Sequence, residues 1–158
     1  MRVSTYKTDR LTTARMSMVR RKSTEPELAV RSLVRSMGFT CRLNCPHLPG
    51  KPDLVLIRER KAIFVHGCFW HRHGRCARGR LAPSRNASLW EAKRDHNAKR
   101  DRRNVRALQR LGWSVLVVWE CALRNPERVR ITLARFLEKS PGDAPNTADL
   151  KVPRLRSG

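Results

Sequence analysis

The chain has 158 residues, of which 40% are hydrophobic, and its 35 lysines and arginines outnumber its 13 acidic residues to give a formal net charge of +22 at pH 7. At this length one domain with one core is expected, and no stretch approaches the ~18 consecutive apolar residues that a membrane span needs. The charge is concentrated in two blocks, residues 1–22 with net +6 and residues 71–110 with net +10, which is typical of a protein that binds nucleic acid.

The five cysteines, an odd number, follow a polar N-terminal segment that lacks the apolar core of a signal peptide. This combination argues against a disulfide framework. We therefore expect a cytoplasmic protein whose cysteines are free thiols or metal ligands. The alternatives to a nucleic-acid partner are a generally solvated basic surface and an anionic membrane surface.

The N-terminal part of the chain predicts an arm followed by a helix. Residues 1–22 lack apolar periodicity, so we expect a flexible basic arm that binds DNA. Thr24 and Glu27 then have the spacing of a capping box, and Pro26 suits a first helical turn. Gly38 ends this helix. Its apolar face is formed by Val30, Leu33, Val34 and Met37.

Three short strands are predicted next. Residues 39–43 alternate apolar and polar side chains, which indicates a half-buried strand. A proline-rich loop at 46–52 follows. The apolar runs Asp53–Ile57 and Lys61–His66 are separated by a charged turn and predict a hairpin.

The second half of the chain alternates loop, helix, strand and helix. Residues 67–85 have no period and must form a loop that is held by something other than a core. A second capping box, Ser88 with Glu91, predicts a helix that runs to Leu111. Trp113–Trp119 is almost wholly apolar, as in a central strand that is buried on both faces.

The last predicted helix begins at Asn125-Pro126, and residues 140–158, with three prolines and no pattern, predict a disordered tail. The inner face of that helix is formed by Val129, Leu133, Phe136 and Leu137. The order of elements predicts one mixed α/β domain over residues 23–139, in which helices flank a small sheet.

Histidines and cysteines are dense in residues 66–76, a composition typical of metal sites. Cys68, His73 and Cys76 offer three ligands, and a fourth cysteine would complete the tetrahedral set that structural zinc prefers. The candidates for the fourth ligand are Cys121, Cys41 and Cys45. For Cys41 we favour the role of a small buried hydrophobe, because it shares the inward parity of its strand.

Asp53 and His66 form a second candidate site. They stand at the start and the end of the two hairpin strands, where an acid and an imidazole could hold a divalent ion against a phosphodiester. The alternative is that Asp53 is only a turn residue.

The predicted helix 88–111 carries a third feature on one face. At ~100° per residue, four of its residues fall within about 60° of one another; they are Trp90, Lys93, Asn97 and Asp101, and Leu108 continues the stripe. The face is either a wall that contacts a ligand or a core stripe that runs out into solvent. The adjacent aromatics Phe69 and Trp70 fit stacking on bases, or a small core around the metal.

Six segments match a known family in one collinear register over residues 12–138. They are Leu48–Asp53, Phe64–His71, Trp90 with Lys93, Arg100–Arg103, Leu111–Trp113 and Val118–Arg124. Together they resemble the very short patch repair (Vsr) family of DNA mismatch endonucleases.

The resemblance implies an α/β, restriction-endonuclease-like three-layer fold with a structural zinc site. The implied activity is a magnesium-dependent nick in duplex DNA, 5′ to the thymine of a T:G mismatch that deamination of 5-methylcytosine leaves behind. It further implies a bacterial, nucleoid-associated monomer that contacts other mismatch-repair proteins.

The resemblance also implies roles by position. Asp53 would bind Mg²⁺ through its carboxylate and Val65 through its carbonyl, His71 would be the general base, and His66 and Glu27 would support the water and metal network. The implied zinc ligands are Cys68, His73, Cys76 and Cys121. The implied DNA contacts are Met16, Phe69, Trp70, Trp90, Lys93 and Asn97.

This sequence departs from the family pattern in three ways. Val65 replaces a familiar threonine, His66 stands where restriction enzymes offer a lysine, and one extra residue precedes Cys76, which affects the choice of His73 as zinc ligand. For Asp101 we favour a structural role. The rival functions are a sequence-specific restriction or homing-type nuclease on the same scaffold, and a zinc-bearing DNA-binding module without catalysis.

Overall fold

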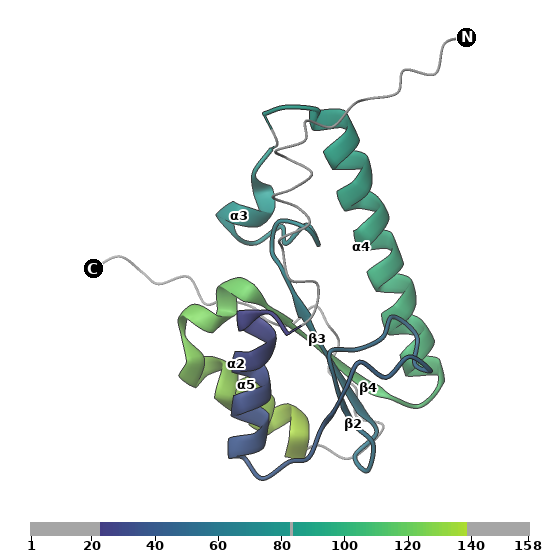
Figure 1. The fold of residues 1–158 in the computed structure, drawn as a ribbon, viewed down its shortest axis with the longest axis vertical. Coiled ribbons are helices and arrows are strands. Elements are labelled where there is room, and N and C mark those ends of the chain that lie inside the picture. Colours follow the sequence, from purple (N-terminus) through teal and green to yellow (C-terminus); the bar gives the residue numbers. More distant parts are fainter. Residues whose placement is uncertain (1–22, 83, 139–158) are drawn as a thin grey trace.

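The computed structural model describes residues 23–82 and 84–138. The predicted basic arm, the predicted tail and the predicted DNA contact Met16 lie outside the described residues. Within them the chain forms the predicted order of helix, three strands, helix, strand and helix (Figure 1). In this part of the chain no helix is long and apolar enough to cross a membrane.

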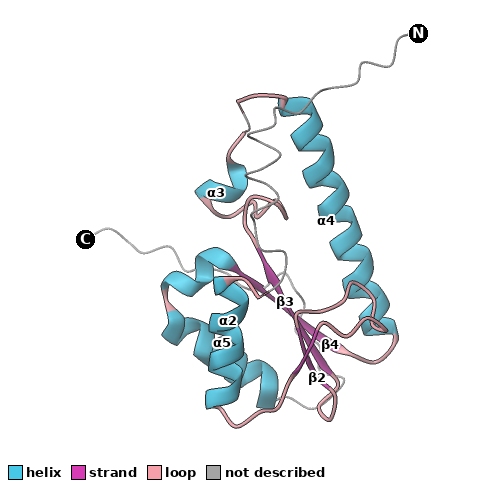
Figure 2. Cartoon of the chain, in the orientation of Figure 1, coloured by secondary structure: helices cyan, strands magenta, loops and turns pink. Residues whose placement is uncertain are grey.

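Four strands form one mixed sheet in the order β1-β2-β3-β4. They are β1 (Arg42–Leu43), β2 (Leu54–Leu56), β3 (Lys61–His66) and β4 (Ser114–Trp119). The first three are antiparallel, which confirms the hairpin, whereas β3 and β4 are parallel and pair His66 with Trp119. The long helix α4 (Ala87–Arg110) connects the two parallel strands (Figure 2).

The sheet lies between two helical layers, with α2 (Glu25–Ser36) and α5 (Pro126–Glu138) on one face and α4 on the other (Figure 1). The core on the α2 and α5 side contains Ile63, and the smaller core on the α4 side contains Phe64 and Leu108. Successive residues of β3 therefore serve opposite cores. The predicted inner face of α5 is confirmed in full by the buried Val129, Leu133, Phe136 and Leu137.

Helix α2 matches its prediction except at the cap. Val30 and Val34 are fully buried, and Gly38 follows the helix with a φ of +84°, which favours glycine. Glu27 accepts hydrogen bonds from the backbone N–H of Ser23 and the hydroxyl of Thr24, both at 2.9 Å. The Thr24 side chain makes no cap hydrogen bond of its own, and Glu27 accepts the N–H of Ser23 rather than that of Thr24, so the capping box does not form as predicted.

The strand predicted over 39–43 is confined to Arg42–Leu43, and Leu43 is exposed. Cys41 is a free thiol that packs against the larger core, as expected of a small hydrophobe. The strand predicted at 113–119 is confirmed as β4, most of whose residues are buried. Its predicted central position is wrong, because β4 lies at the edge of the described sheet. Helices cover both faces of β4, although one edge of the strand is unpaired in the described part of the chain. The apolar sequence predicts that both faces are buried, but it does not predict how many neighbouring strands β4 has.

The prediction of a capping box at Ser88 is also wrong. Helix α4 begins at Ala87, and its N-cap Asn86 adopts a left-handed conformation without a side-chain cap. Glu91 instead forms ion pairs with Arg94 and Arg72. Two short elements were not predicted, α3 (Ala77–Arg80) and the 3-10 helix η1 (Glu120–Arg124).

Candidate active site and cysteine-histidine cluster

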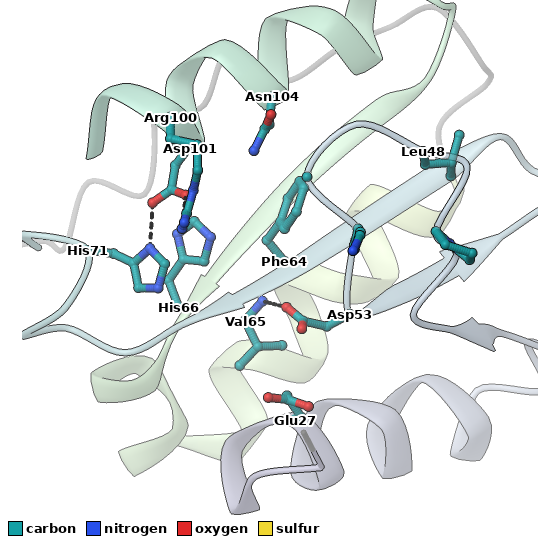
Figure 3. A pocket seen from close by; sticks show the side chains of 13 residues that line it. Glu27, Leu48, Asp53, Phe64, Val65, His66, His71, Arg100, Asp101 and Asn104 are labelled. Atoms are coloured by element: carbon teal, nitrogen blue, oxygen red, sulfur yellow. Dashed lines mark hydrogen bonds and ion pairs between the residues drawn. The ribbon is translucent and has the colours of Figure 1, made fainter. Parts of the chain in front are cut away.

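A pocket of about 670 Å³ opens between the carboxyl end of β3, the start of α2 and the middle of α4 (Figure 3). Its lining contains Glu27, Pro46, Leu48, Gly50, Lys51, Asp53, Phe64, Val65, His66, His71, Arg100, Asp101 and Asn104. Gly50 has a φ of +75° and lies so close to Asn104 that a Cβ on Gly50 would be 2.8 Å from the Asn104 side chain. This contact brings the loop before β2 to the rim of the pocket.

Asp53 points into the pocket immediately before β2. Its Oδ2 accepts the backbone N–H of Val65 at 2.7 Å. Burial raises the pKa of Asp53 to about 6, and the nearby carboxylate of Glu27 adds to this, while the Val65 N–H and His71 oppose it. Asp53 is therefore a carboxylate with too little positive charge around it, and a bound cation would supply that charge.

Two histidines form the opposite wall. The imidazoles of His66 and His71 stack with centroids 4.0 Å apart and an interplanar angle of 9°. Burial, and then the neighbouring His71, lower the pKa of His66 to about 3, so the His66 ring is neutral at physiological pH. Asp53, His66 and His71 thus line one pocket, as the sequence hypothesis required.

Asp101 contacts His71, although the sequence favoured a structural role for Asp101 over support of a catalytic site. Its Oδ2 lies within hydrogen-bond distance of His71 Nδ1. Burial alone would raise the pKa of Asp101, but the hydrogen bond with His71 lowers it below its usual value. The sequence carried one signal for a functional position of Asp101, which is the stripe from Trp90 to Leu108. That stripe placed Asp101 on the same helix face as Trp90 and its neighbours.

The predicted fourth ligand, Cys121, completes a cluster of cysteine and histidine side chains. The ligand atoms of Cys68, His73, Cys76 and Cys121 lie within 4.8 Å of one another, and Cys41 and Cys45 are not part of this cluster. The Cys68 and Cys121 sulfurs lie 3.6 and 3.3 Å from His73 Nδ1. Tetrahedral zinc with ordinary bond lengths would separate sulfur from nitrogen by about 3.6 Å, so the donor set fits that ion.

The cluster is held by its own loop and by β4. Cys76 Sγ accepts the backbone N–H of Gly79 at 3.3 Å. Burial would raise the pKa of the Cys76 thiol, but this hydrogen bond, together with those from Cys68, Cys121 and the Arg78 backbone, lowers it. The His73 ring stacks on Trp119 with centroids 4.3 Å apart, and the rings of Trp119 and His66 form a T-shaped contact with centroids 5.4 Å apart. The cluster and the pocket are therefore in contact through one indole ring.

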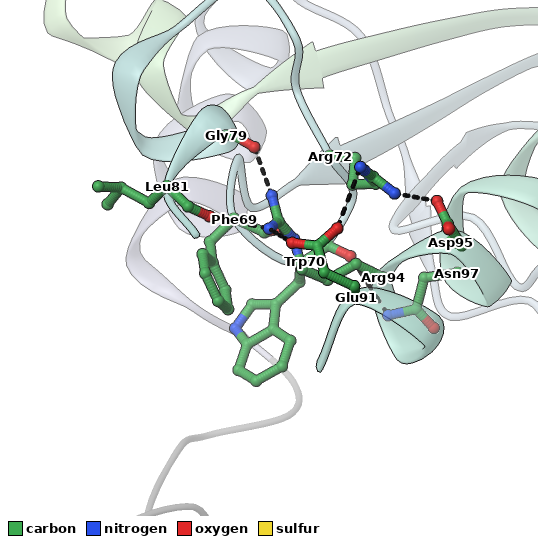
Figure 4. Close-up of polar contacts among 9 residues, drawn as sticks. All are labelled: Phe69, Trp70, Arg72, Gly79, Leu81, Glu91, Arg94, Asp95 and Asn97. Carbon is green, nitrogen blue, oxygen red and sulfur yellow. Dashed lines mark hydrogen bonds and ion pairs between the residues drawn. The ribbon is translucent and has the colours of Figure 1, made fainter. Parts of the chain in front are cut away.

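Aromatic side chains gather at the N-terminal end of α4. Trp70 meets Phe69 and Trp90 edge to face, at 5.1 and 5.5 Å between centroids. The ammonium of Lys93 lies 5.7 Å from the Trp70 ring and 5.4 Å from the Trp90 ring. Asn97 donates a hydrogen bond to the Trp70 carbonyl at 3.3 Å (Figure 4). The predicted face of α4 thus runs from the aromatic group, past the pocket, to the core at Leu108.

Comparison with known proteins identifies the class as an endonuclease. Residues 6–78 match the sequence profile of the family described as DNA mismatch endonuclease Vsr. The DNA mismatch endonuclease Vsr of Escherichia coli is 41% identical over 114 residues, which are 72% of either chain. The type II nicking enzyme V.XorIIP of Xanthomonas oryzae is 45% identical over 137 residues, covering 84% of this chain and 99% of that protein. A further relative is the type II nicking enzyme V.NmeAIP of Neisseria meningitidis, 38% identical over 136 residues, 84% of this chain and 96% of its own length. The chain belongs to the Vsr family of DNA mismatch endonucleases.

Proposed function

We propose that this endonuclease uses magnesium to nick one strand of duplex DNA 5′ to the thymine of a T:G mismatch. The main support is the convergence of Asp53, His66, His71 and Asp101 on one pocket that lies beside a group of partly exposed aromatic side chains. A pocket of this kind offers cation ligands and a proton acceptor at one point. The aromatic group offers surfaces that can enter a base stack.

Magnesium would be held by the Asp53 carboxylate and the Val65 carbonyl. The raised pKa of the half-buried Asp53 supports this assignment, because burial leaves its carboxylate short of positive charge. Glu27 lies close enough to contribute to that rise, so the pocket concentrates negative charge. A divalent ion bound here would polarise the phosphoryl oxygen and favour water as a nucleophile.

His71 is the proposed general base. With its proton on Nδ1 and shared with Asp101, the Nε2 lone pair is free to accept a proton from the attacking water. His66 stacks on His71 as a neutral ring and limits its rotation. Attack in line with the 3′ oxygen would leave a 5′-phosphate and a 3′-hydroxyl.

Mismatch recognition is assigned to the aromatic group. Phe69, Trp70 and Trp90 would insert beside the T:G pair, with Met16, Lys93 and Asn97 contacting the opened site. Insertion costs a few kcal/mol of unstacking at each step, and a wobble pair resists it less than a matched pair does. The exposed arginines of α4 between residues 100 and 110 would contact phosphates and account for binding that does not depend on sequence.

A structural zinc ion is assigned to Cys68, His73, Cys76 and Cys121. Four protein ligands leave no open position for a substrate. We further propose that the protein acts as a monomer in the bacterial cytoplasm, and that other mismatch-repair proteins contact it.

The decisive experiment compares nicking of a T:G duplex with nicking of the matched T:A and C:G duplexes, each with and without Mg²⁺. We expect a nick only in the T:G duplex and only with the metal. The variant Asp53→Asn should lose nicking while it retains binding to the T:G duplex. Nicking by Asp53→Asn at the parental rate would exclude the metal assignment.

A second candidate function is sequence-specific nicking of matched DNA, since two of the relatives described above are named type II nicking enzymes. The same assay separates the two functions when the flanking sequence is varied. Cleavage of matched duplexes in one flanking context, with no preference for T:G, would favour the second candidate.

A further inference from the structure

Arg94 is the one buried arginine in the described part of the chain, with 2% of its surface exposed. It follows Lys93 on α4, a helix rich in basic residues. Its side chain nevertheless points inward, beneath the loop that carries Phe69 and Trp70 (Figure 4). Burying a guanidinium is costly unless its donors and its charge are compensated. Its contacts therefore indicate what the residue does.

The guanidinium binds three carbonyls from both ends of one loop. Its Nε donates to the Phe69 carbonyl at 2.8 Å, and its terminal nitrogens donate to the carbonyls of Gly79 and Leu81. Glu91 supplies the counter-charge at 2.9 Å. The planar fork of arginine can satisfy such divergent acceptors at once, whereas a lysine ammonium presents its donors from a single point.

The same guanidinium also supports the Phe69 ring. Its Cζ lies 4.6 Å from the ring centroid, within the range of a cation–π contact. One turn further along α4, Asn97 holds the next carbonyl, that of Trp70. Two successive carbonyls of the aromatic pair are thus fixed by α4.

Gly79 links this anchor to the cysteine-histidine cluster. Its carbonyl accepts from Arg94 while its N–H donates to Cys76 Sγ. A Cβ at Gly79 would lie 2.0 Å from the His73 carbonyl oxygen, so the loop crosses itself there with no room for a side chain. Arg94 therefore closes the loop at the point where its two arms meet.

We propose that Arg94 is the positioning residue that holds Phe69 and Trp70 ready for insertion into DNA. This inference rests on the proposed function, in which the aromatic pair enters the stack at the mismatch. A loop fixed before binding avoids the entropy loss of ordering it in the complex. Arg94 itself is buried and does not touch DNA, so its effect falls on mismatch binding.

The test uses Arg94→Met, which keeps the length of the stem and removes every donor, and Arg94→Lys, which keeps the charge. The control is Arg135→Met, which removes an exposed charge from α5 in the other helical layer. Zinc content and thermal unfolding show whether each variant retains its fold.

The first measurement is binding to T:G and T:A duplexes that carry 2-aminopurine beside the mismatch position. For Arg94→Met we expect T:G binding to weaken about tenfold, with a smaller unstacking signal and little change in T:A binding. The nicking rate at saturating T:G duplex should fall much less than the affinity, because bound DNA orders the loop. Arg94→Lys should not rescue T:G binding, and Arg135→Met should behave as the parent does.

The second measurement needs no DNA. Hydrogen exchange in residues 67–81 should be faster in both Arg94 variants than in the parent, with β3 and β4 unchanged. This readout separates the two proposals. A parent without T:G preference would refute the proposed function, whereas the exchange result would still report on the anchor.

Parental T:G preference in a folded Arg94→Met protein, or unchanged exchange in residues 67–81, would overturn the inference. Should Arg94→Met lose its fold, Arg94→Lys becomes the deciding variant. If both variants unfold as a whole, Arg94 holds the domain together rather than the aromatic pair, and the inference is equally overturned.

Discussion

Replacing Asp101 by asparagine tests whether Asp101 sets the tautomer of His71, the proposed general base. The carboxylate of Asp101 is 15% exposed and accepts the Nδ1 proton of His71. Asparagine has nearly the same shape, but its amide can donate to Nδ1 instead. His71 would then carry its proton on Nε2, toward the pocket, and could not accept one from water.

The size of the effect follows from this change of tautomer. General-base catalysis contributes roughly 10²- to 10⁴-fold, and a fraction of the Asp101→Asn molecules can still adopt the active tautomer. We therefore expect the nicking rate to fall by ~10²- to 10³-fold, which is about 3 to 4 kcal/mol of transition-state stabilisation. Binding should be unchanged, because Asp101 faces the pocket and not the aromatic group.

Single-turnover nicking of a T:G duplex, measured from pH 6 to 9, provides the assay. The defect should persist across this range, since the asparagine amide stays uncharged and its NH₂ group can donate to His71 Nδ1 at every pH tested. Asp95→Asn is the matched control, because Asp95 lies on the same helix and pairs with the exposed Arg72. A rate for Asp101→Asn within about threefold of the parent would refute the proposed orientation of His71.

Three further predictions concern the metal cluster and the core. Cys121→Ser should retain less than one zinc ion after dialysis, whereas Cys45→Ser, which alters a cysteine outside the cluster, should retain one, as metal analysis will show. Gly79→Ala should lower both zinc content and melting temperature, because the new methyl group would meet a carbonyl oxygen at 2.0 Å; a fully loaded, equally stable variant would contradict this. Burial lowers the pKa of Lys61 in the folded protein below 10.5, so the cost of burying its charge is full below the folded pKa and is relieved as the pH rises from there to 10.5. The parent should therefore gain stability relative to Lys61→Met as the pH is raised toward 10.5, as thermal unfolding at several pH values can measure.

The helices and the hairpin could be predicted because their signals are local. The apolar spacing in α2 and α5 depends on side chains within a few turns, and the buried residues are those that the spacing selected. The edge position of β4 could not be predicted in the same way. The apolar sequence of β4 predicts that both of its faces are buried. Which strands pair with β4 depends instead on where the connection through α4 returns the chain to the sheet after β3.

The residues of the candidate site could likewise be predicted only in part. The sequence by itself singled out Asp53 and His66 and narrowed the fourth ligand of the candidate metal site to three cysteines, and the family resemblance added His71 and Cys121, since motif spacing can be read without coordinates. The closeness of Cys121 to the other three ligand atoms, the pairing of Asp101 with His71 and the burial of Arg94 are visible only in the tertiary structure. These contacts join residues that are far apart in the chain, and their geometry exists only after α4 has packed against the sheet and the loop before it.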